Sequence, residues 1–241
     1  MNNKNQSTII GSGFIAKNFN KYGDFFKNHR FQIYAAGVSN SLCKENKLFK
    51  KDKKKLIDFC KKIKDGEKLL YFSTCSIEDP SRNKNFYVRH KLEIEDIIKS
   101  NFDKYLIVRL PEVVGKNSNI NTLINFFFNK IKRKEKFDLW TKAKRSIIDI
   151  EDVIKILIHF ISNNKLDKNQ TINIANPNKN SPIDIVTILE SIIRIKADYN
   201  LVEKGKENWE IDISDTNNSI KKCGINFEND YLKNALMKYY N

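Results

Sequence analysis

Residues 9–19 have the sequence IIGSGFIAKNF, and this stretch decides the fold class. Apolar residues lead up to a turn that contains Gly11 and Gly13, and a segment with helical character follows the turn. A strand, a glycine turn and a helix in this order begin a βα unit. Strands and helices keep alternating along the chain. This order predicts an α/β fold with a parallel sheet that is covered by helices on both faces.

The apolar periodicity outlines the elements that follow this first unit. Strands are expected at 31–38, 68–75 and 170–176, and the segment 105–115 is expected to be a buried strand that a proline-containing turn closes. Helices are expected at 47–64, 87–100, 122–133 and 181–195, and residues 145–162 combine a short strand with a helix. The helix expected at 181–195 should begin at Ser181 as its N-cap, with Pro182 in its first turn. The segments after the alternation predict a small C-terminal lobe.

The composition of the 241 residues, of which 40% are hydrophobic, is enough for one sizeable core. No run approaches the roughly 18 apolar residues that span a bilayer. The N-terminal sequence MNNKNQSTIIGSG lacks the basic-then-apolar order of a signal peptide, so a cytoplasmic protein is predicted. The histidines are scattered and no cysteine pair has CxxC spacing, so reduced thiols and no metal site are expected at Cys43, Cys60, Cys75 and Cys223.

The net charge of +15 has two interpretations. A basic surface can bind nucleic acid, but lysine is abundant throughout this chain and its densest run, KKDKKK at 50–55, is expected to form the solvated face of a helix. A basic surface also favours smaller anions, including a nucleotide diphosphate. Nucleic acid is therefore not the expected partner.

The glycine turn has the pattern G-x-G-x-x-A, formed by Gly11, Gly13 and Ala16. In dinucleotide-binding turns the first glycine permits the tight turn and the second lets the backbone approach a pyrophosphate. The third small residue keeps the helix close to the strand. The alternative is an ordinary βα turn that binds nothing.

A second pattern lies in YFSTCSIEDPSRNKNFYVRHKLEIEDII, residues 71–98. Tyr87 and Lys91 are four residues apart and share one face of a helix. An ammonium group beside a phenol stabilises the phenolate, so the tyrosine can exchange a proton with a substrate. Thr74, at the end of the preceding strand, can bind the same substrate oxygen. The alternative is a surface helix in which YxxxK occurs by chance.

Taken in order, these motifs resemble the extended short-chain dehydrogenase/reductase family, of the NAD-dependent nucleotide-sugar epimerase/dehydratase type. The resemblance continues in the segments VRLPEVVGKNS, LWTKAKRSIIDIEDVIKIL, TINIAN and SPIDIVTILESI and covers most of the chain. It implies a Rossmann-like cofactor domain, approximately residues 1–115 and 146–175. Interleaved with this domain in one compact unit would be a small substrate-binding lobe, approximately residues 116–145 and 176–241.

The resemblance also implies roles for individual residues. Tyr87 would be the acid/base, Lys91 would tune it and hold the nicotinamide ribose, and Thr74 would polarise the substrate oxygen. NAD or NADP would lie against Gly11, Gly13, Phe14, Ile15, Ala35, Ala36, Gly37, Ser73 and Lys91. The nucleotide-sugar substrate would meet Cys75, Ser76, Glu112, Trp140 and Arg145. Of these, Arg145 suits the diphosphate and Trp140 could flank the base or belong to the core. A homodimer through the YxxxK helix and the helix at 47–64 is a further option.

The sequence departs from the family pattern after the catalytic Thr. Dehydratases carry an Asp-Glu pair at the positions of Cys75 and Ser76, so a 4,6-dehydratase is not expected. Keto-sugar reduction or epimerisation by hydride transfer is predicted instead, in surface polysaccharide or deoxysugar biosynthesis. Glu112 is a second departure, because the family often has Asn there. A sugar hydroxyl or Lys116 is its expected partner.

A third departure lies between Gly13 and Ala35, an interval of only 22 residues. This interval has room for about one helix and one strand, so the fold is predicted to be trimmed by about one βαβ piece. An acidic residue that would read the cofactor ribose has no clear candidate, since Asp24 comes too early and Glu45 too late. NAD versus NADP therefore stays open. So does a second class of function, a non-catalytic Rossmann-fold binding or regulatory protein that has lost cofactor affinity.

Overall fold

The structure is a computed structural model that describes residues 8–80, 84–117, 119–164, 166, 169–205, 209–228 and 230–241. The chain divides into two compact units. The first contains Met1–Thr74, Asn85–Arg109 and Ile161–Ile172. The second contains Cys75–Lys84, Leu110–Phe160 and Asn173–Asn241. Each unit has its own sheet structure and its own apolar cluster.

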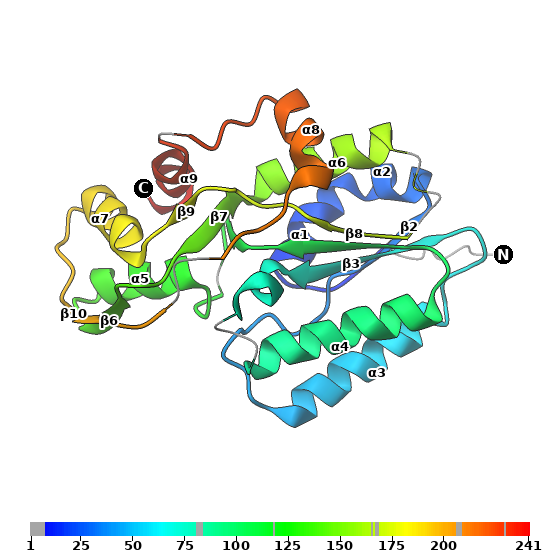
Figure 1. Cartoon of the computed structure of the whole chain (residues 1–241), viewed down its shortest axis with the longest axis horizontal. Helices are drawn as coiled ribbons and strands as arrows, with labels where there is room; N and C mark the ends of the chain where they lie inside the picture. Colours follow the sequence, from blue (N-terminus) through cyan, green and yellow to red (C-terminus); the bar gives the residue numbers. More distant parts are fainter. Residues whose placement is uncertain are drawn as a thin grey trace. The chain divides into compact units, whose positions relative to one another are not determined.

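The first unit is built on a five-stranded sheet with the order β1-β2-β3-β4-β8 (Figure 1). The strands are β1 (Ile9–Ile10), β2 (Phe31–Tyr34), β3 (Lys68–Thr74), β4 (Tyr105–Leu110) and β8 (Gln170–Asn173). The pairs β1–β2 and β2–β3 are parallel, with Ile9 opposite Ile33 and Tyr34 opposite Tyr71. This arrangement confirms the predicted α/β class with a parallel central sheet.

Helices α3 (Asn46–Cys60) and α4 (Phe86–Asn101) pack on one face of this sheet. Their inward residues form an apolar cluster with the strands, composed of Tyr34, Leu56, Phe59, Cys60, Leu69, Tyr71, Ile94, Ile98 and Ile107. The buried stripe of α3 begins at Phe49 and not at the preceding apolar residue, Leu48. Leu48 is 41% exposed.

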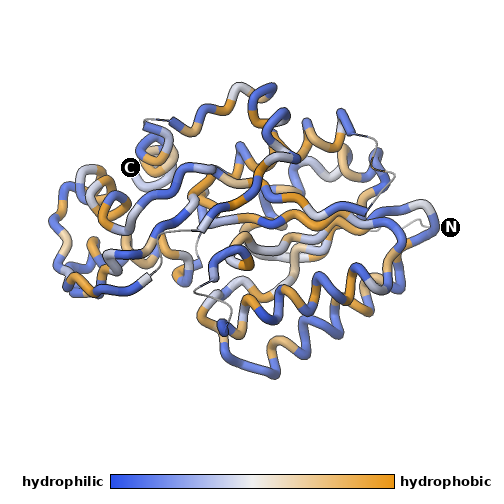
Figure 2. Tube along the Cα trace, viewed as in Figure 1, coloured by the Kyte–Doolittle hydropathy of each residue, from blue (hydrophilic) through white to orange (hydrophobic). Residues whose placement is uncertain are grey.

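The opposite face carries α1 (Phe14–Phe19), the 3-10 helix η1 (Asn20–Tyr22) and α2 (Gly23–Asn28). The Phe19 ring lies 4.7 Å from the Phe72 ring and 5.6 Å from the Phe26 ring, measured between centroids. Tyr71 and Phe72 point to opposite faces because side chains alternate along a strand. Both faces of the sheet are therefore covered, and Figure 2 shows the central strands as largely hydrophobic.

The interval between Gly13 and β2 is fully described, and it contains α1, η1 and α2 but no strand. As a consequence, β1 pairs directly with β2 and lies at the edge of the five-stranded sheet.

Gly11, which follows β1, has φ of +143°, a conformation that residues with a side chain rarely adopt. A Cβ atom at Gly11 would lie 2.4 Å from the backbone oxygen of Ala35. Gly11→Ala is therefore expected to lower the free energy of unfolding by about 1–3 kcal/mol, measured by urea denaturation. Gly13→Ala is the matched control, because a Cβ there meets no atom within 4 Å. Equal losses in the two variants would contradict the close approach at Gly11.

The second unit contains two small sheets. In one, β5 (Glu112–Val114) pairs in parallel with β7 (Arg145–Asp149), and β7 pairs antiparallel with β9 (Lys179–Asn180). In the other, β6 (Phe137–Trp140) pairs in parallel with β10 (Tyr199–Val202). The remaining elements are the 3-10 helix η2 (Cys75–Glu78) and the helices α5 (Leu123–Lys132), α6 (Ile150–Asn163), α7 (Pro182–Ile193), α8 (Ser214–Lys222) and α9 (Tyr231–Tyr240).

Helices α5, α7 and α9 and the strands β6 and β7 share the apolar cluster of the second unit. Its buried members include Phe127, Leu139, Ile147, Leu189 and Leu236. Helix α7 begins as predicted. Ser181 is its N-cap and forms a capping box with Asp184, and Pro182 occupies the first turn.

The predicted strand 105–115 is two strands that belong to different sheets. β4 pairs within the five-stranded sheet, and β5 pairs with β7. Pro111 separates them, because proline has no N–H group to donate to a strand ladder. The unit boundaries also differ from the predicted domain boundaries. Residues 146–160, which the prediction grouped with residues 1–115, lie in the second unit, where β7 pairs with β5 and β9.

Within the described residues, no helix combines the length and the apolar character that crossing a membrane requires. The prediction made from the N-terminal sequence, MNNKNQSTIIGSG, depends in part on residues 1–7, which lie outside the described residues.

Candidate active site

The structure brings Tyr87 and Lys91 together on α4. The side chain of Asn85 accepts hydrogen bonds from the backbone N–H groups of Tyr87 and Val88, at 2.9 and 3.2 Å, and so caps the helix. This cap starts the helix immediately before Tyr87 and places the two side chains on one face. The Lys91 Nζ atom lies 5.8 Å from the centroid of the Tyr87 ring.

Lys91 is only 5% exposed and points at the end of strand β3. Its Nζ atom donates hydrogen bonds to Tyr71 Oη at 3.0 Å and to the backbone oxygen of Phe72 at 3.1 Å. Burial lowers the pKa of Lys91 to about 8, although the nearby charges of Asp52 and Glu95 act to raise it. A buried ammonium that costs folding free energy is typical of functional sites.

Replacing Lys91 with Met is expected to raise the free energy of unfolding at pH 7. Lowering the pKa from 10.5 to about 8 corresponds to about 3 kcal/mol of disfavoured charging, against about 1 kcal/mol for each lost hydrogen bond. The unfolded chain binds more protons than the folded protein between these values, so the stability of the wild type rises with pH across this window. The higher free energy of unfolding of Lys91→Met relative to the wild type should therefore disappear by about pH 10.5.

Urea denaturation of both proteins between pH 7 and 10.5 would check this result. Lys55→Met, an exposed lysine of α3, is the control and should change stability by no more than about 0.5 kcal/mol at any pH. A stability difference for Lys91→Met that does not vary with pH would contradict a buried, charged lysine.

Other predicted residues gather at the same edge of the sheet. Ser73 and Thr74 are buried at the carboxyl end of β3, which Lys91 contacts through the backbone oxygen of Phe72. Ala35, Ala36 and Gly37 follow β2, the neighbouring parallel strand. A Cβ atom at Gly37 would lie 3.3 Å from Lys91 Nζ. Gly11, Gly13, Phe14 and Ile15 follow β1, which runs parallel to β2. Ligands of open α/β sheets bind at this carboxyl edge.

Three further residues of this region were missed by sequence analysis. The Asp52 carboxylate, in the middle of KKDKKK, is buried and contacts His90 of α4 and Tyr34 of β2. The lysines of this run are on the outside as predicted, but Asp52 is not. A signal was present, because Phe49, Asp52, Leu56 and Phe59 recur at helical spacing, so Asp52 falls on the apolar stripe.

The predicted substrate residues lie in the second unit, on η2, β5, β6 and β7. Cys75 is 1% exposed and packs in an apolar cluster with Ala175, Trp209 and Ile211, and Ser76 follows it in η2. Glu112 Oε1 accepts a hydrogen bond at 3.1 Å from the backbone N–H of Leu123, the first residue of α5. A carboxylate is favourable at this position because the helix dipole is positive there.

Trp140 and Arg145 belong to strands β6 and β7 of the second unit. Trp140 is 42% exposed, and Lys204 Nζ lies 5.9 Å from the centroid of one of its rings. This exposure excludes Trp140 from the core of the second unit. Arg145 is half-buried at the start of β7, where its Nη1 atom donates a hydrogen bond to the backbone oxygen of Lys144 at 2.8 Å.

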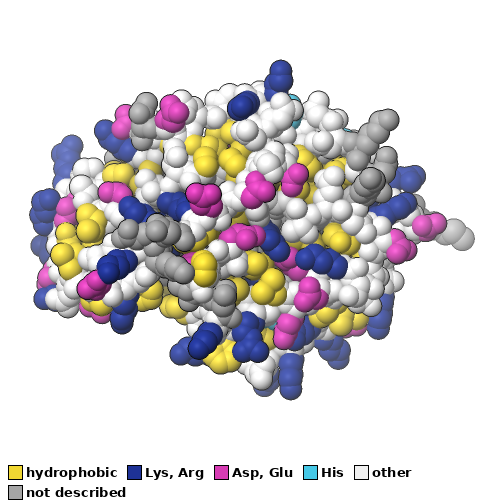
Figure 3. Space-filling model, in the orientation of Figure 1, with side chains coloured by type: hydrophobic (Ala, Val, Ile, Leu, Met, Phe, Trp, Pro, Cys, Tyr) yellow, Lys and Arg dark blue, Asp and Glu magenta, His cyan; other side chains and the backbone are white. Residues whose placement is uncertain are grey.

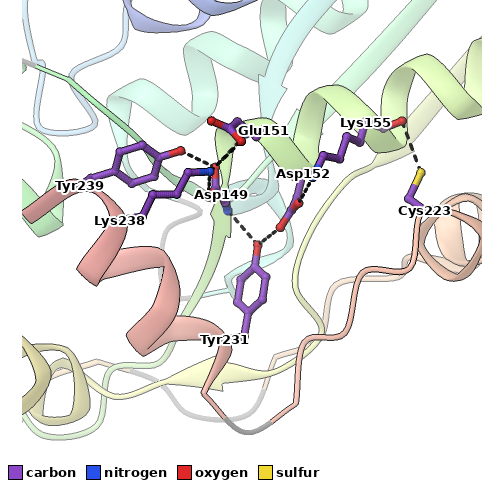
Figure 4. Close-up of polar contacts among 8 residues, drawn as sticks. All are labelled: Asp149, Glu151, Asp152, Lys155, Cys223, Tyr231, Lys238 and Tyr239. Carbon is purple, nitrogen blue, oxygen red and sulfur yellow. Dashed lines mark hydrogen bonds and ion pairs between the residues drawn. The ribbon is translucent and has the colours of Figure 1, made fainter.

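A polar network in the second unit connects α9 to β7 and α6 (Figure 4). Lys238 Nζ bridges Asp149 Oδ2 at 3.0 Å and Glu151 Oε2 at 2.7 Å. Tyr239 Oη donates to Asp149 Oδ1 at 2.8 Å, and Tyr231 Oη donates to the carboxylate of Asp152 at 2.8 Å. A cavity of about 420 Å³ lies beside these residues. The acidic groups of β7 and α6 bond to side chains of α9. The network therefore has a structural role and holds α9 against β7 and α6.

In the part of the chain that the structure describes, no group of three or more His, Cys, Asp or Glu side chains is arranged to hold a metal ion. On the face drawn in Figure 3, Lys and Arg side chains are scattered, with Asp and Glu side chains among them. The described residues on this face do not form the continuous basic patch that binding to a polynucleotide favours.

A sequence model of the NAD-dependent epimerase/dehydratase family matches residues 35–175, which is more than half of the chain. The chain belongs to this family. The matched region includes Thr74, Tyr87, Lys91 and Arg145. No curated protein sequence matches the chain significantly.

Solved structures with a similar fold include several enzymes that act on sugar nucleotides. UDP-glucuronic acid 4-epimerase from Bacillus cereus, in complex with UDP-glucuronic acid and NAD, has a TM-score of 0.67 at 19% identity, over 90% of this chain and 77% of that one. RMD from Pseudomonas aeruginosa, complexed with NADPH, has a TM-score of 0.68 at 13% identity, over 95% and 94%. UDP-N-acetylglucosamine 4-epimerase from Methanobrevibacter ruminantium M1, in complex with UDP-N-acetylmuramic acid, has a TM-score of 0.60 at 18% identity, over 90% and 78%. At these identities the likeness establishes the fold.

Proposed function

We propose that the protein is an NAD(P)-dependent oxidoreductase that reduces or epimerises a nucleotide-activated sugar. The observation that carries this proposal is the buried ammonium of Lys91, held 5.8 Å from the Tyr87 ring beside the end of β3. Membership of the NAD-dependent epimerase/dehydratase family supports it. So do folds shared with enzymes whose structures contain NAD or NADPH.

The residues at the carboxyl edge of the first unit fit the nicotinamide half of such a cofactor. The space beside Gly13 is open, because a Cβ built there meets no atom within 4 Å, and a phosphate can approach the backbone. At Gly37 the absence of a side chain lets the turn after β2 approach Lys91 closely, since a Cβ there would lie 3.3 Å from Nζ. Lys91 would hold the ribose, and Ser73, Ala35 and Ala36 would line the same edge.

A bound nicotinamide would supply or accept the hydride. Tyr87 would give its phenolic proton to the carbonyl oxygen of a keto-sugar during reduction, and would take a proton from the sugar hydroxyl during oxidation. The positive charge of Lys91 would stabilise the phenolate that remains after reduction. Thr74 would donate a hydrogen bond to the same sugar oxygen and fix its position.

The nucleotide sugar is proposed to contact residues of the second unit. The planar guanidinium of Arg145 suits a diphosphate, and the exposed ring of Trp140 suits stacking on a nucleotide base. Cys75 and Ser76 offer no carboxylic acid for the elimination of water, so 4,6-dehydration is not part of the proposal. Glu112, whose Oε1 atom accepts a hydrogen bond from the N-terminus of α5, is proposed to contact a sugar hydroxyl as well.

The physiological setting that we propose is surface polysaccharide or deoxysugar biosynthesis, in the cytoplasm. A homodimer through α3 and α4 is also part of the proposal, since Leu48, Ile57 and Leu92 are exposed on these helices.

The second candidate function is a non-catalytic binding or regulatory protein. The specific observation in its favour is the short interval between Gly13 and β2, which contains no strand. We propose that the fold is shortened here relative to the family, so the adenosine half of a dinucleotide would have fewer contacts. The sequence also offers no clear candidate for the acidic residue that would bind the cofactor ribose, and this favours the second candidate.

Titration with NAD(H) and NADP(H), followed by nicotinamide fluorescence, separates the two candidates. Micromolar binding of one cofactor, weakened in Gly13→Ala without loss of stability, followed by turnover of a panel of UDP-sugars, is the expected result. Absence of dinucleotide binding in the folded wild-type protein would overturn the enzyme proposal and favour the second candidate.

A further inference from the structure

The buried carboxylate of Asp52 is the centre of a hydrogen-bond network inside the first unit. Its Oδ1 atom accepts a hydrogen bond from Tyr34 Oη at 2.8 Å. Its Oδ2 atom is 2.8 Å from His90 Nε2 and accepts a hydrogen bond from the backbone N–H of Val38 at 3.1 Å. Asp52 therefore connects four segments of the chain: α3, α4, β2 and the turn that follows β2 (Figure 1).

His90 is suited to hold this carboxylate in its ionised form. The ring is 2% exposed and stacks on Phe49 with centroids 4.5 Å apart. Its Nδ1 atom is buried and has no hydrogen-bond partner, so a proton there would be an unsatisfied donor. The hydrogen bonding fits the tautomer with its proton on Nε2, which donates to Asp52 and leaves the negative charge on the carboxylate.

The charge of Asp52 acts at the position of Lys91. A Cβ atom at Gly37 would lie 3.3 Å from Lys91 Nζ and 3.4 Å from Asp52 Oδ2, so the two ions flank the same backbone position. Burial alone would raise the pKa of Asp52. Hydrogen bonds from His90, Tyr34 and the Val38 N–H outweigh burial and hold that pKa below its ordinary value.

The other titratable groups around Lys91 do not replace Asp52. Glu95, one turn further along α4, is bound by Arg109 through two hydrogen bonds and by Lys99. Tyr71 of β3 and Tyr34 of β2 face the same region, and burial raises the pKa of both phenols, so they are neutral. Tyr87 lies on the helix of Lys91 itself. Asp52 is therefore the carboxylate that faces Lys91 without a cationic Lys or Arg partner of its own among the described contacts.

We propose that Asp52, held by His90 and Tyr34, is a positioning residue that keeps Lys91 charged and fixes the Gly37–Val38 turn. It would act on the reaction through Lys91 and would touch neither substrate nor cofactor. The catalytic consequence rests on the proposed function, but the effect on Lys91 does not. Asp52 is the one acidic residue of the KKDKKK run. A helix face that only contacts solvent would not need a carboxylate at this position.

Asp52→Asn tests the proposal, because it keeps the shape and removes the charge. NMR titration of isotope-labelled protein can follow the side chain of Lys91, identified by the signal that Lys91→Met removes. In Asp52→Asn the ionisation midpoint of Lys91 should fall by about one pH unit. Asp58→Asn, an exposed residue of the same helix, should leave it unchanged. His90→Gln can still donate to Asp52 and should also leave it near the wild-type value.

A double-mutant cycle protects the test against a variant that does not fold. If Asp52→Asn unfolds because Lys91 is left without compensation, Asp52→Asn combined with Lys91→Met should fold again and recover the lost urea midpoint. Failure of the double variant to recover would overturn the proposal. An unchanged Lys91 midpoint in folded Asp52→Asn would also overturn it.

The outcomes separate this inference from the proposed function. If the ionisation midpoint of Lys91 falls in Asp52→Asn but the wild-type protein binds no dinucleotide, the positioning role stands and the proposed function fails. If the wild type binds dinucleotide and Asp52→Asn leaves the ionisation midpoint of Lys91 unchanged, the proposed function stands and the positioning role fails. If both stand, the alkaline loss of turnover in Asp52→Asn should move to lower pH by the same amount as the Lys91 midpoint.

Discussion

Replacing Tyr87 with Phe is expected to lower the turnover of a UDP-sugar substrate by roughly 10²–10⁴-fold, the usual contribution of a positioned acid/base. The variant keeps the ring that packs above Lys91, so folding and dinucleotide binding should be nearly unchanged. Only the phenolic oxygen is lost, to which we assign the proton exchange in the proposed function. The measurement is the initial rate of sugar interconversion or reduction at saturating cofactor, together with the dissociation constant of the dinucleotide.

The matched control for this change is Tyr22→Phe, which removes the same oxygen from an exposed tyrosine of the first unit. Its turnover should equal that of the wild type. Wild-type activity in Tyr87→Phe would exclude Tyr87 as the acid/base. A parallel loss of dinucleotide affinity would instead assign the hydroxyl to cofactor binding.

Replacing Glu95 with Ala is expected to lower the free energy of unfolding by about 3–5 kcal/mol, because it removes the buried carboxylate of an ion pair with a partly buried guanidinium. Glu95 is fully buried on α4. Arg109 of β4 donates to both of its carboxylate oxygens, from Nε at 2.9 Å and from Nη2 at 2.7 Å. Two parallel hydrogen bonds of this kind fix the distance between a helix and a strand. Urea denaturation would measure the loss.

The exposed neighbour Glu93 is the control, since it forms a surface ion pair with Lys53. Glu93→Ala should change stability by less than about 1 kcal/mol. If both variants lose the same free energy, burial of the Glu95–Arg109 pair is not the source of the effect.

The stabilisation by Glu95 should also depend on pH. Burial alone would raise the pKa of the Glu95 carboxyl, but its hydrogen bonds and the charge of Arg109 hold it below the ordinary value of 4.5. A carboxyl with a lowered pKa stabilises the folded protein fully above the unfolded value and loses that contribution as the pH falls through the folded value. The difference between wild type and Glu95→Ala should therefore shrink below about pH 4.5. A constant difference down to acid pH would contradict this linkage.

Much of the fold could be predicted from sequence because the signals are local. The glycine turn, the alternation of strands and helices and the start of α7 at Ser181 each depend on a few neighbouring residues. The pairing of Tyr87 with Lys91 follows from helix geometry alone. The gathering of residues 35–37 and Ser73–Thr74 at one edge follows once the strands are parallel, and this too was predicted.

Other features could not be found in this way because they depend on contacts between distant segments. Pro111 marks a break in the strand, but nothing in the local sequence indicates that the residues on its two sides join different sheets. The hydrogen bond between Glu112 and the start of α5 is set by the path of the chain, and the local sequence did not indicate it. The network of Lys238, Asp149 and Glu151 joins residues almost ninety positions apart.

By itself the sequence determined the α/β class, the glycine turn and the Tyr87–Lys91 pair, since each follows from backbone geometry over at most a few turns. Only the tertiary structure decided that Asp52 points inward among lysines that point out. The reason is physical: a carboxylate on the buried side of a helix is stable only if donors from elsewhere reach it. Here those donors come from β2, the turn after β2, and α4, which lie next to Asp52 only in the folded chain.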